Sequence, residues 1–246
     1  MKISIITACY NSEKTISRTI ESILNQTYQD IELIVIDGDS SDDTLEKLNN
    51  YSKNISFMIS ERDNGIYDAL NKGLKQSNGD IIAFLHSDDF YPNNKILENV
   101  INQFKINDKV DIVLGDIAFI DNNKNFKRFY SGENFNFNYG IMPPHPSTFI
   151  KKKYYNSYGN FNLKYKIASD YDLLFRFIIL NKAGIRYSNN ILVYMKPGGK
   201  SNKNIYSIFN LNKEIYDIHK SHNKPIRLFN LLRKIPIRLA ELIHEK

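Results

Sequence analysis

Hydrophobic and polar positions follow two spacings in turn along the first ninety residues. Short apolar runs, typical of buried strands, occupy 3–7, 31–36, 55–60 and 81–85. Segments with apolar residues at helical spacing follow the first three runs, at 14–25, 42–50 and 66–76. Strands that are buried on both faces are apolar throughout, whereas a surface helix is apolar on one face only. The repeated strand–helix unit therefore predicts an α/β fold with a mainly parallel central sheet flanked by helices.

The second half of the chain is less regular. The pattern predicts helices at 94–105 and from 168 to 181, and strands at 111–120, 126–130, 148–151 and 184–195. On the helix that ends at Asn181, Leu173 and Phe177 face the predicted core and Arg176 does not. Asp172, in the first turn of this helix, is expected to cap it.

The composition changes after residue 205. Six lysines and arginines lie between Lys220 and Ala240 with no acidic residue among them, and apolar residues recur there at helical spacing. We therefore divide the chain into a catalytic domain at 1–205 and a basic amphipathic helical tail at 206–246. Such a tail can lie on an anionic membrane, but it can equally pack on the domain.

Polar clusters follow three of the predicted parallel strands, at 7–11, 37–39 and 87–89. Because the carboxyl ends of parallel strands meet at one edge of the sheet, the clusters predict a nucleotide-type pocket there. Asp88 and Asp89 would repel each other, and a hard divalent cation would relieve the repulsion. Neither a GxGxxG fingerprint nor a P-loop is present. The alternative is an Asp-rich turn that caps the following helix.

Charge and cysteine content narrow the class of protein. The net charge of +6 and pI of about 9.1 suit a polyanion, an anionic membrane or a phosphorylated ligand. Cys9 is the single cysteine, which excludes an intrachain disulfide and fits a reducing compartment. The first residues do not form a signal peptide, and no apolar run approaches the ~20 residues that span a bilayer. We expect a cytoplasmic protein, either soluble or peripheral at the inner membrane face.

Six motifs, in order, carry a resemblance to a known family. They are ISIITACYN at 3–11, ELIVIDGDSSDDTL at 32–45, SERDNGIYDALNKGLKQSNGDIIAFLHSDD at 60–89, PHPSTF at 144–149, SDYDLLFRF at 169–177 and PGGKS at 197–201. The chain resembles the family 2 glycosyltransferases of the GT-A fold, and in particular the bacterial branch that builds surface polysaccharides. The resemblance implies transfer of a sugar from a UDP- or GDP-linked donor to a hydroxyl of a glycan or lipid-linked acceptor, mostly with inversion. It implies no nucleic-acid partner.

The resemblance also implies roles for individual residues. Asp170 matches the catalytic base, and Asp88 and Asp89 match the acidic motif that binds Mn²⁺ or Mg²⁺. His145 and Lys200 are expected to orient the donor or the acceptor. The residues expected to bind the donor nucleotide or its diphosphate are Thr7, Tyr10, Asn11, Asp37, Asp63, Asp68, Asn71, Lys72, Ser87 and Asp88.

Two positions depart from the family pattern. His86 replaces the first acid of the usual D-x-D motif, and Leu70 stands where many relatives have an arginine. A phosphate contact is then either missing or supplied by Lys72 or Lys200. These departures keep open a nucleotide-sugar-binding module with weak catalysis, and the sheet architecture alone would also suit a nucleotidyltransferase.

Overall fold

The computed structural model describes residues 1–121, 125–196 and 205–232. The strands are β1 (Ile3–Cys9), β2 (Ile31–Asp37), β3 (Phe57–Ser60), β4 (Ile81–Phe84), β5 (Ile112–Ile120), β6 (Phe126–Tyr130), β7 (Thr148–Lys151) and β8 (Ile185–Met195). The α-helices are α1 (Ile16–Leu24), α2 (Thr44–Asn49), α3 (Ile66–Gln76), α4 (Ile96–Ile106), α5 (Lys153–Tyr158), α6 (Ser169–Phe175), α7 (Ile205–Ser221) and α8 (Leu228–Leu232). Shorter helical turns are η1 (Phe137–Tyr139), η2 (His145–Ser147) and the π-helical η3 (Arg176–Leu180).

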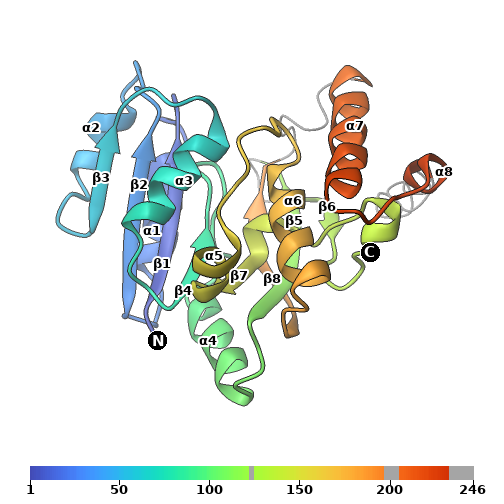
Figure 1. Ribbon diagram of the computed structural model, residues 1–246. Coiled ribbons are helices and arrows are strands. Elements are labelled where there is room, and N and C mark those ends of the chain that lie inside the picture. Colours follow the sequence, from blue (N-terminus) through green and yellow to red (C-terminus); the bar gives the residue numbers. More distant parts are fainter. Residues whose placement is uncertain (122–124, 197–204, 233–246) are drawn as a thin grey trace.

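The strands form one sheet in the order β3-β2-β1-β4-β7-β5-β6, with β8 beside β5 (Figure 1). In the first half, β1 is parallel to both β2 and β4, and β2 is parallel to β3. The predicted βαβ array is thereby confirmed. The antiparallel strand β7 lies between β4 and β5 and joins the two halves of the sheet.

The sheet separates two apolar cores. Residues of α1 and α4 pack on one face, whereas residues of α3, α5, α6 and α7 pack on the other. Alternate residues of β1 serve the two sides, because Ile5 belongs to the first core and Ile6 to the second. This two-sided burial explains why the first strands are apolar throughout.

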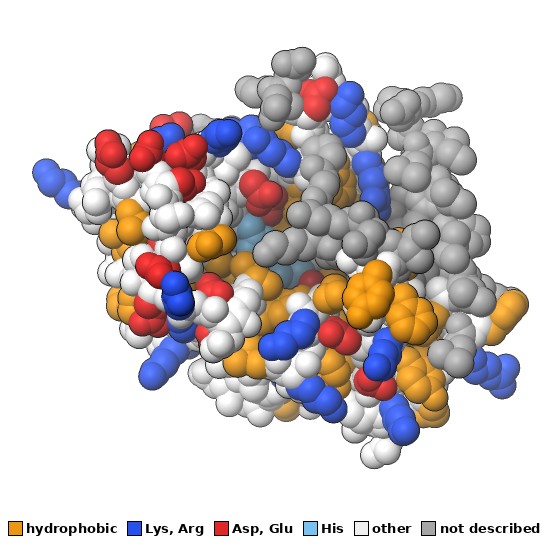
Figure 2. Space-filling model, turned by 90° about the horizontal axis from the view of Figure 1, so that it is seen from above, with side chains coloured by type: hydrophobic (Ala, Val, Ile, Leu, Met, Phe, Trp, Pro, Cys, Tyr) orange, Lys and Arg blue, Asp and Glu red, His pale blue; other side chains and the backbone are white. Residues whose placement is uncertain are grey.

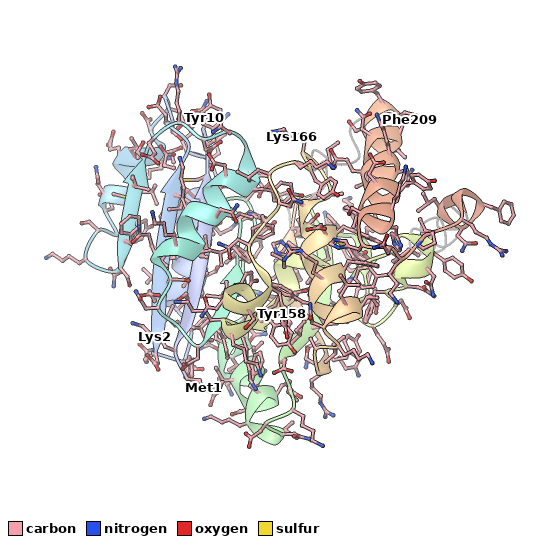
Figure 3. All side chains as sticks on the ribbon, viewed as in Figure 1. Met1, Lys2, Tyr10, Tyr158, Lys166 and Phe209 are labelled. Carbon is pink, nitrogen blue, oxygen red and sulfur yellow. The ribbon has the colours of Figure 1, made fainter. Side chains whose placement is uncertain are left out.

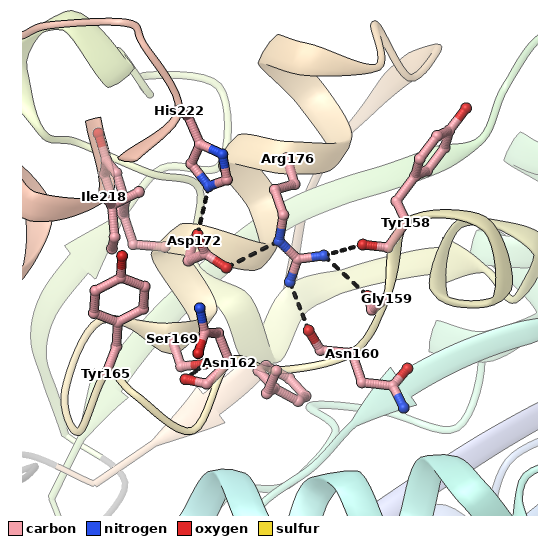
Figure 4. Close-up of polar contacts among 12 residues, drawn as sticks. Tyr158, Gly159, Asn160, Asn162, Tyr165, Ser169, Asp172, Arg176, Ile218 and His222 are labelled. Carbon is pink, nitrogen blue, oxygen red and sulfur yellow. Dashed lines mark hydrogen bonds and ion pairs between the residues drawn. The ribbon is translucent and has the colours of Figure 1, made fainter. Parts of the chain in front are cut away.

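The helix predicted to run to residue 181 differs from expectation. The α-helix α6 ends at Phe175 and a π-helical turn continues the chain to Leu180. Arg176 was expected to face away from the core, but only 14% of its side chain is exposed. Its guanidinium donates to Asp172 Oδ2 at 2.9 Å and to the backbone carbonyls of 158–160 (Figure 4).

Asp172 does not cap the helix either. Its carboxylate is 2% exposed and lies between two partners, the Arg176 guanidinium and His222 Nε2, the latter at 2.8 Å from Oδ1 (Figure 4). A buried carboxylate with charged and hydrogen-bonding partners on both oxygens is a structural contact. The helical pattern gave no sign of it because His222 lies 50 residues away in sequence.

Helix α7, which begins the predicted tail, packs on the rest of the described chain. In α7, Ile215 and Ile218 are buried and belong to the core that contains α6. The division at residue 205 stays a prediction, and residues 233–246 of the predicted tail lie outside the described residues. Within the described part of the chain, no helix is both long enough and apolar enough to cross a membrane.

Substitution of Arg176 tests the buried pair. Arg176→Met leaves the Asp172 carboxylate buried with one partner fewer, so we expect the free energy of unfolding to fall by ~3–5 kcal/mol. Urea denaturation measures this change. Arg186→Met is the matched control, because Arg186 is exposed and, among the described residues, its side chain bonds only Gln103, through Nε. Equal stability of the two variants would contradict the interpretation.

Candidate active site

The carboxyl ends of β1, β2 and β4 meet at one edge of the sheet. Tyr10, just after β1, lies at this edge, whereas Met1 and Lys2 lie at the opposite end (Figure 3). Side chains tie the loops together: Ser40 Oγ accepts from Asn11 N at 2.8 Å, and the hydroxyls of Ser12 and Ser87 are 2.8 Å apart. The three predicted polar clusters therefore belong to one site.

The residues after β1 lie at different depths. Thr7 is fully buried, and its hydroxyl has no hydrogen-bond partner among the described residues. Tyr10 is 62% exposed and can contact a ligand. Asn11 adopts a left-handed conformation with φ of 48°, which asparagine tolerates well, and its Oδ1 accepts from Ser41 N at 2.9 Å.

Asp37 is fully buried at the end of β2. Its Oδ2 accepts from Ser40 N at 2.9 Å and from Ser60 Oγ at 2.7 Å, and its Oδ1 accepts from Ser40 Oγ. The carboxylate therefore holds the turn after β2 against the end of β3. Recognition of a base or ribose by Asp37 stays a prediction.

The start of α3 contains two of the predicted donor-binding acids. Asp63 Oδ1 accepts from Gly65 N at 2.8 Å, and Asp68 Oδ2 accepts from Asn64 N at 2.9 Å. Gly65 has φ of 111°, a conformation that favours glycine. The two carboxylates thus fix a turn for which the Asp-Asn-Gly sequence is well suited. Asp63 Oδ2 also lies 2.8 Å from the position of a Cβ on Gly38, so this turn reaches the loop after β2.

Three more α3 residues have their surroundings within the protein: Lys72 and Asn71 have polar partners, and Leu70 is packed in the core. Lys72 Nζ is 2.8 Å from Glu61 Oε1. Asn71 makes two hydrogen bonds with the backbone of Phe161, at 2.9 and 3.0 Å. Leu70 is 1% exposed in the core, so an apolar residue suits this position and a charged arginine would have to be buried.

The two acids after β4 face different surroundings. Asp88 is exposed, whereas Asp89 is fully buried, and neither carboxylate oxygen of Asp89 has a hydrogen-bond partner among the described residues. Burial, and secondarily Asp88, raise the pKa of Asp89, while the nearby Arg18 opposes the rise. Arg18 lies over the Phe90 ring at 4.0 Å. An unsatisfied buried carboxylate is costly, so this position calls for a further partner.

Two histidines lie beside the acids. The His145 ring stacks on Phe84 at 4.9 Å and is 6.5 Å from the His86 ring. Burial lowers the pKa of both, that of His145 to about 3, so both rings are neutral near pH 7. Seen from the carboxyl-end side, histidine and acidic surface lie together in a hollow whose floor is hydrophobic (Figure 2).

Asp170 lies in the first turn of α6. Its Oδ1 accepts from the Tyr67 hydroxyl at 3.1 Å and from Tyr171 N at 2.8 Å, and no described residue bonds Oδ2. Burial raises the pKa of Asp170 to about 6, although the hydrogen bonds from Tyr171 N and Tyr67 act in the opposite direction. The carboxylate is held by one oxygen and keeps a raised basicity, which suits proton abstraction near neutral pH.

A chain of aromatic contacts joins Asp170 to the acidic motif. The Tyr67 ring stacks on Phe161 at 5.4 Å, and Phe161 lies edge-on to His145 at 5.5 Å. His145 in turn lies beside His86, two residues before Asp88. The structure therefore brings Asp170, His145, Ser87 and Asp88 to one site. Lys200 lies outside the described residues.

A divalent cation fits the acidic motif. Asp88 is open to solvent and Asp89 offers two unbonded carboxylate oxygens. Across the described ranges, no three or more His, Cys, Asp or Glu side chains are grouped so that they could bind a metal. Mg²⁺ and Mn²⁺ are commonly held by one or two carboxylates, with water and substrate phosphate completing the shell. The residues present suit such a shared site and not an all-protein cage.

The sequence analysis missed Tyr67 and Glu214. Tyr67 lies inside the quoted motif at 60–89, but its hydroxyl bonds Asp170 across 103 residues. Glu214 accepts hydrogen bonds from the backbone amides of 166–168, just before Asp170. No local pattern marks either contact, because both depend on how distant helices pack.

Comparison with protein families finds a match to the model of Glycosyl transferase family 2 over residues 4–181. A PGL/p-HBAD biosynthesis glycosyltransferase of Mycobacterium tuberculosis is 28% identical over 203 residues, which is 81% of this chain and 78% of the relative. The Escherichia coli protein named UDP-Glc:alpha-D-GlcNAc-diphosphoundecaprenol beta-1,3-glucosyltransferase WfgD is 37% identical over 137 residues, 55% of this chain and 53% of the relative.

Solved structures share the fold. Residues 1–349 of Staphylococcus aureus TarS in complex with UDP give a TM-score of 0.67 at 21% identity, covering 89% of this chain and 65% of that chain. The Pyrobaculum calidifontis mannosyltransferase PcManGT, in complex with GDP-Man and Mn²⁺, gives a TM-score of 0.66 at 15% identity, covering 92% of this chain and 65% of that chain. This chain thus spans less than two thirds of either solved chain. The likeness confirms the predicted GT-A fold.

Proposed function

The chain belongs to glycosyl transferase family 2 and is a glycosyltransferase, and we propose that it moves a sugar, with inversion, from a UDP- or GDP-linked donor to a hydroxyl of a lipid-linked or polysaccharide acceptor. The observation that carries the proposal is Asp170, a half-buried carboxylate with one oxygen that no described residue bonds, connected by aromatic contacts to the acidic motif. The base and the diphosphate site of one transfer reaction would thus be linked through a continuous series of packed rings.

The choice of donor rests on the relatives. TarS has been solved with UDP and with UDP-GlcNAc, and WfgD is named for UDP-Glc. A uridine donor therefore comes first and a guanosine donor second, since PcManGT was solved with GDP-Man. WfgD is named for a diphosphoundecaprenol-linked acceptor, which supports a lipid-linked acceptor here.

The reaction needs one proton transfer and one displacement. The acceptor hydroxyl attacks the anomeric carbon, and Asp170 takes its proton through the unbonded oxygen. The bond from the anomeric carbon to the phosphate oxygen breaks, and the nucleoside diphosphate leaves with the electron pair. A single displacement of this kind inverts the anomeric configuration.

Asp88 and Asp89 would hold Mn²⁺ or Mg²⁺ together with the donor diphosphate. The bound cation would supply Lewis-acid stabilisation of the charge that develops on the leaving group. Within the chain, Ser87 is fixed by its contact with Ser12, so the motif keeps its place beside the loop after β1. The His86 and His145 rings lie next to each other, and His145 contacts Phe161, which packs on Tyr67 beside Asp170.

A stripe along α7 supports peripheral contact with a membrane at the cytoplasmic face. Exposed aromatic and basic residues recur every three or four positions on one face of the helix, namely Tyr206, Phe209, Lys213, Tyr216 and Lys220. Phe209 points outward from the helix, away from the body of the protein (Figure 3). Aromatic rings and lysines together suit the interface of an anionic bilayer, where a lipid-linked acceptor would lie.

Replacement of the proposed base is the direct test of the mechanism. Asp170→Asn keeps the shape and accepts the same hydrogen bonds but cannot take a proton, so kcat should fall by ~10²–10⁴-fold with donor affinity nearly unchanged. In the unmodified enzyme the base acts deprotonated, so kcat/KM should fall as the pH drops through about 6. Transfer from UDP-Glc and a panel of other nucleotide-sugars, measured with calorimetric donor binding, gives both quantities.

Asp108→Asn is the control for this variant, because Asp108 is an exposed acid remote from the site in the turn before β5. A helix-capping role for Asp170 predicts normal turnover in Asp170→Asn, since asparagine caps as well as aspartate. Donor binding without any transfer by the unmodified chain would favour a nucleotide-sugar-binding module.

Loss of the exposed acid tests the metal proposal. Asp88→Asn should weaken the Mn²⁺-dependent part of UDP binding by more than ~10-fold and leave metal-free UDP binding in place, because only the cation bridge is lost. Titration calorimetry of UDP and of GDP, each with and without MnCl₂, measures this. Unchanged Mn²⁺ dependence in a folded Asp88→Asn protein would remove Asp88 from the metal site.

Vesicle binding tests the α7 stripe. The double variant Tyr206→Ser and Phe209→Ser removes two exposed rings, so partition onto phosphatidylglycerol vesicles should drop by at least ~10-fold. Phe126→Ser is the matched control, because Phe126 is 41% exposed on β6, away from the stripe. Co-sedimentation that is equal for all three proteins would contradict the membrane contact.

A further inference from the structure

The residues around Asp170 are held from a helix that lies beyond the family match. That match ends at residue 181, whereas α7 begins at Ile205. Glu214 of α7 accepts three hydrogen bonds from successive backbone amides: Oε1 from Lys166 N at 2.9 Å, and Oε2 from Ile167 N at 2.9 Å and Ala168 N at 2.8 Å. One carboxylate thus fixes the backbone that leads directly into Asp170.

Two histidines that follow Glu214 make contacts on the other side of Asp170. His219 Nε2 is 2.8 Å from the hydroxyl of Tyr171, and His222 Nε2 is 2.8 Å from Asp172 Oδ1 (Figure 4). The segment 166–172 is therefore bonded both before and after Asp170 by Glu214, His219 and His222. These three side chains account for the way the start of α6 is attached to α7.

Glu214 satisfies the backbone amides that lead into α6. Ala168 occupies the N-cap position of this helix, and Glu214 accepts from its amide and from the amides of the two residues before it. A carboxylate that accepts from three backbone amides makes charge-assisted hydrogen bonds, which are stronger than bonds between neutral groups. It also places a negative charge at the positive end of the helix.

We propose that Glu214 is a positioning residue for the transfer reaction, which sets the orientation of the Asp170 carboxylate through the 166–168 backbone. The inference rests on the proposed role of Asp170 as the base. It makes α7 a part of the active site, although Glu214 itself contacts no reacting atom.

Tyr67 makes a second link between the 166–168 backbone and Asp170. The Tyr67 hydroxyl donates to Ile167 O at 2.7 Å and to Asp170 Oδ1 at 3.1 Å. One hydroxyl therefore contacts both the backbone that Glu214 bonds and the Asp170 carboxylate. Among the described residues, the titratable side chains that act on Asp170 include Tyr67 from α3 and Glu214 from α7. The Glu214 charge contributes to the raised pKa of Asp170.

Hydrogen exchange and kinetics on Glu214→Ala test the proposal together. Exchange of the 166–168 amides should accelerate at least ~10-fold, because their acceptor is gone. At saturating donor and acceptor, kcat should fall by ~10²-fold, with the donor KM changed less than ~3-fold, since a base displaced by about 1 Å impairs the chemical step and not donor binding. The melting temperature shows whether the variant is folded.

Glu214→Gln tests the negative charge of Glu214 separately from its role in holding the 166–168 backbone. Glutamine keeps one acceptor oxygen and the length of the side chain, so kcat should be largely retained. Its missing charge should lower the pKa of Asp170 and move the acidic limb of the kcat/KM profile to lower pH. Asp217→Asn is the matched control: this acid lies three residues on in α7 and makes no hydrogen bond with a described residue, so exchange, kcat and pH profile should all stay as in the parent.

Two results would overturn the inference. One is unchanged protection of the 166–168 amides in Glu214→Ala, and the other is lost protection with normal kcat. Failure of the proposed function looks different, because the parent protein would then show protected amides but no sugar transfer. If Glu214→Ala does not fold, an unmoved pH profile in Glu214→Gln still contradicts the electrostatic link.

Discussion

The contact between α3 and the segment 161–171 holds the two sides of the site together. Asn71 bonds both the amide and the carbonyl of Phe161, and Tyr67 bonds Ile167 O and Asp170. The sheet alone does not fix the distance between Asp170 and the acidic motif, because β4 and β7 are joined by only a short antiparallel pairing. Polar side chains on one face of α3 therefore tie the segment that contains Asp170 to α3 across a packed interface.

The sequence was sufficient for the strands and for the edge of the sheet where the site lies, but not for α5 or for the end of α6. Strands buried on both faces are apolar without interruption, so 3–7, 31–36 and 81–85 were recognisable, and the polar residues after them had to meet. It was not sufficient for contacts between distant helices. The Asp172–His222 pair and the Glu214 contacts join residues 46–50 positions apart, and a helical pattern shows only that a face is polar, not what it meets.

The different depths of Asp88 and Asp89 lay equally beyond the sequence. Two adjacent acids look equivalent in a motif, but the backbone after β4 turns one outward and buries the other beside Arg18. Lys72 illustrates the same limit: as a free cation it would suit a phosphate, yet it is 25% exposed and paired with Glu61. A part-exposed pair of this kind is worth only about 0–1 kcal/mol, but the sequence gives no sign that Lys72 has it.

The two faces of α7 connect the proposals for membrane contact and for base positioning. Glu214 and His219 face inward and hold the start of α6, while Tyr206, Phe209 and Lys213 face solvent. A helix that lies on a bilayer by its outer face would place the Asp170 side of the site one helix diameter, ~10–12 Å, from the lipid headgroups. On these proposals the hydroxyl of a lipid-linked acceptor would be confined to that surface. Its approach to Asp170 would then be set by the same helix that bonds the 166–168 backbone.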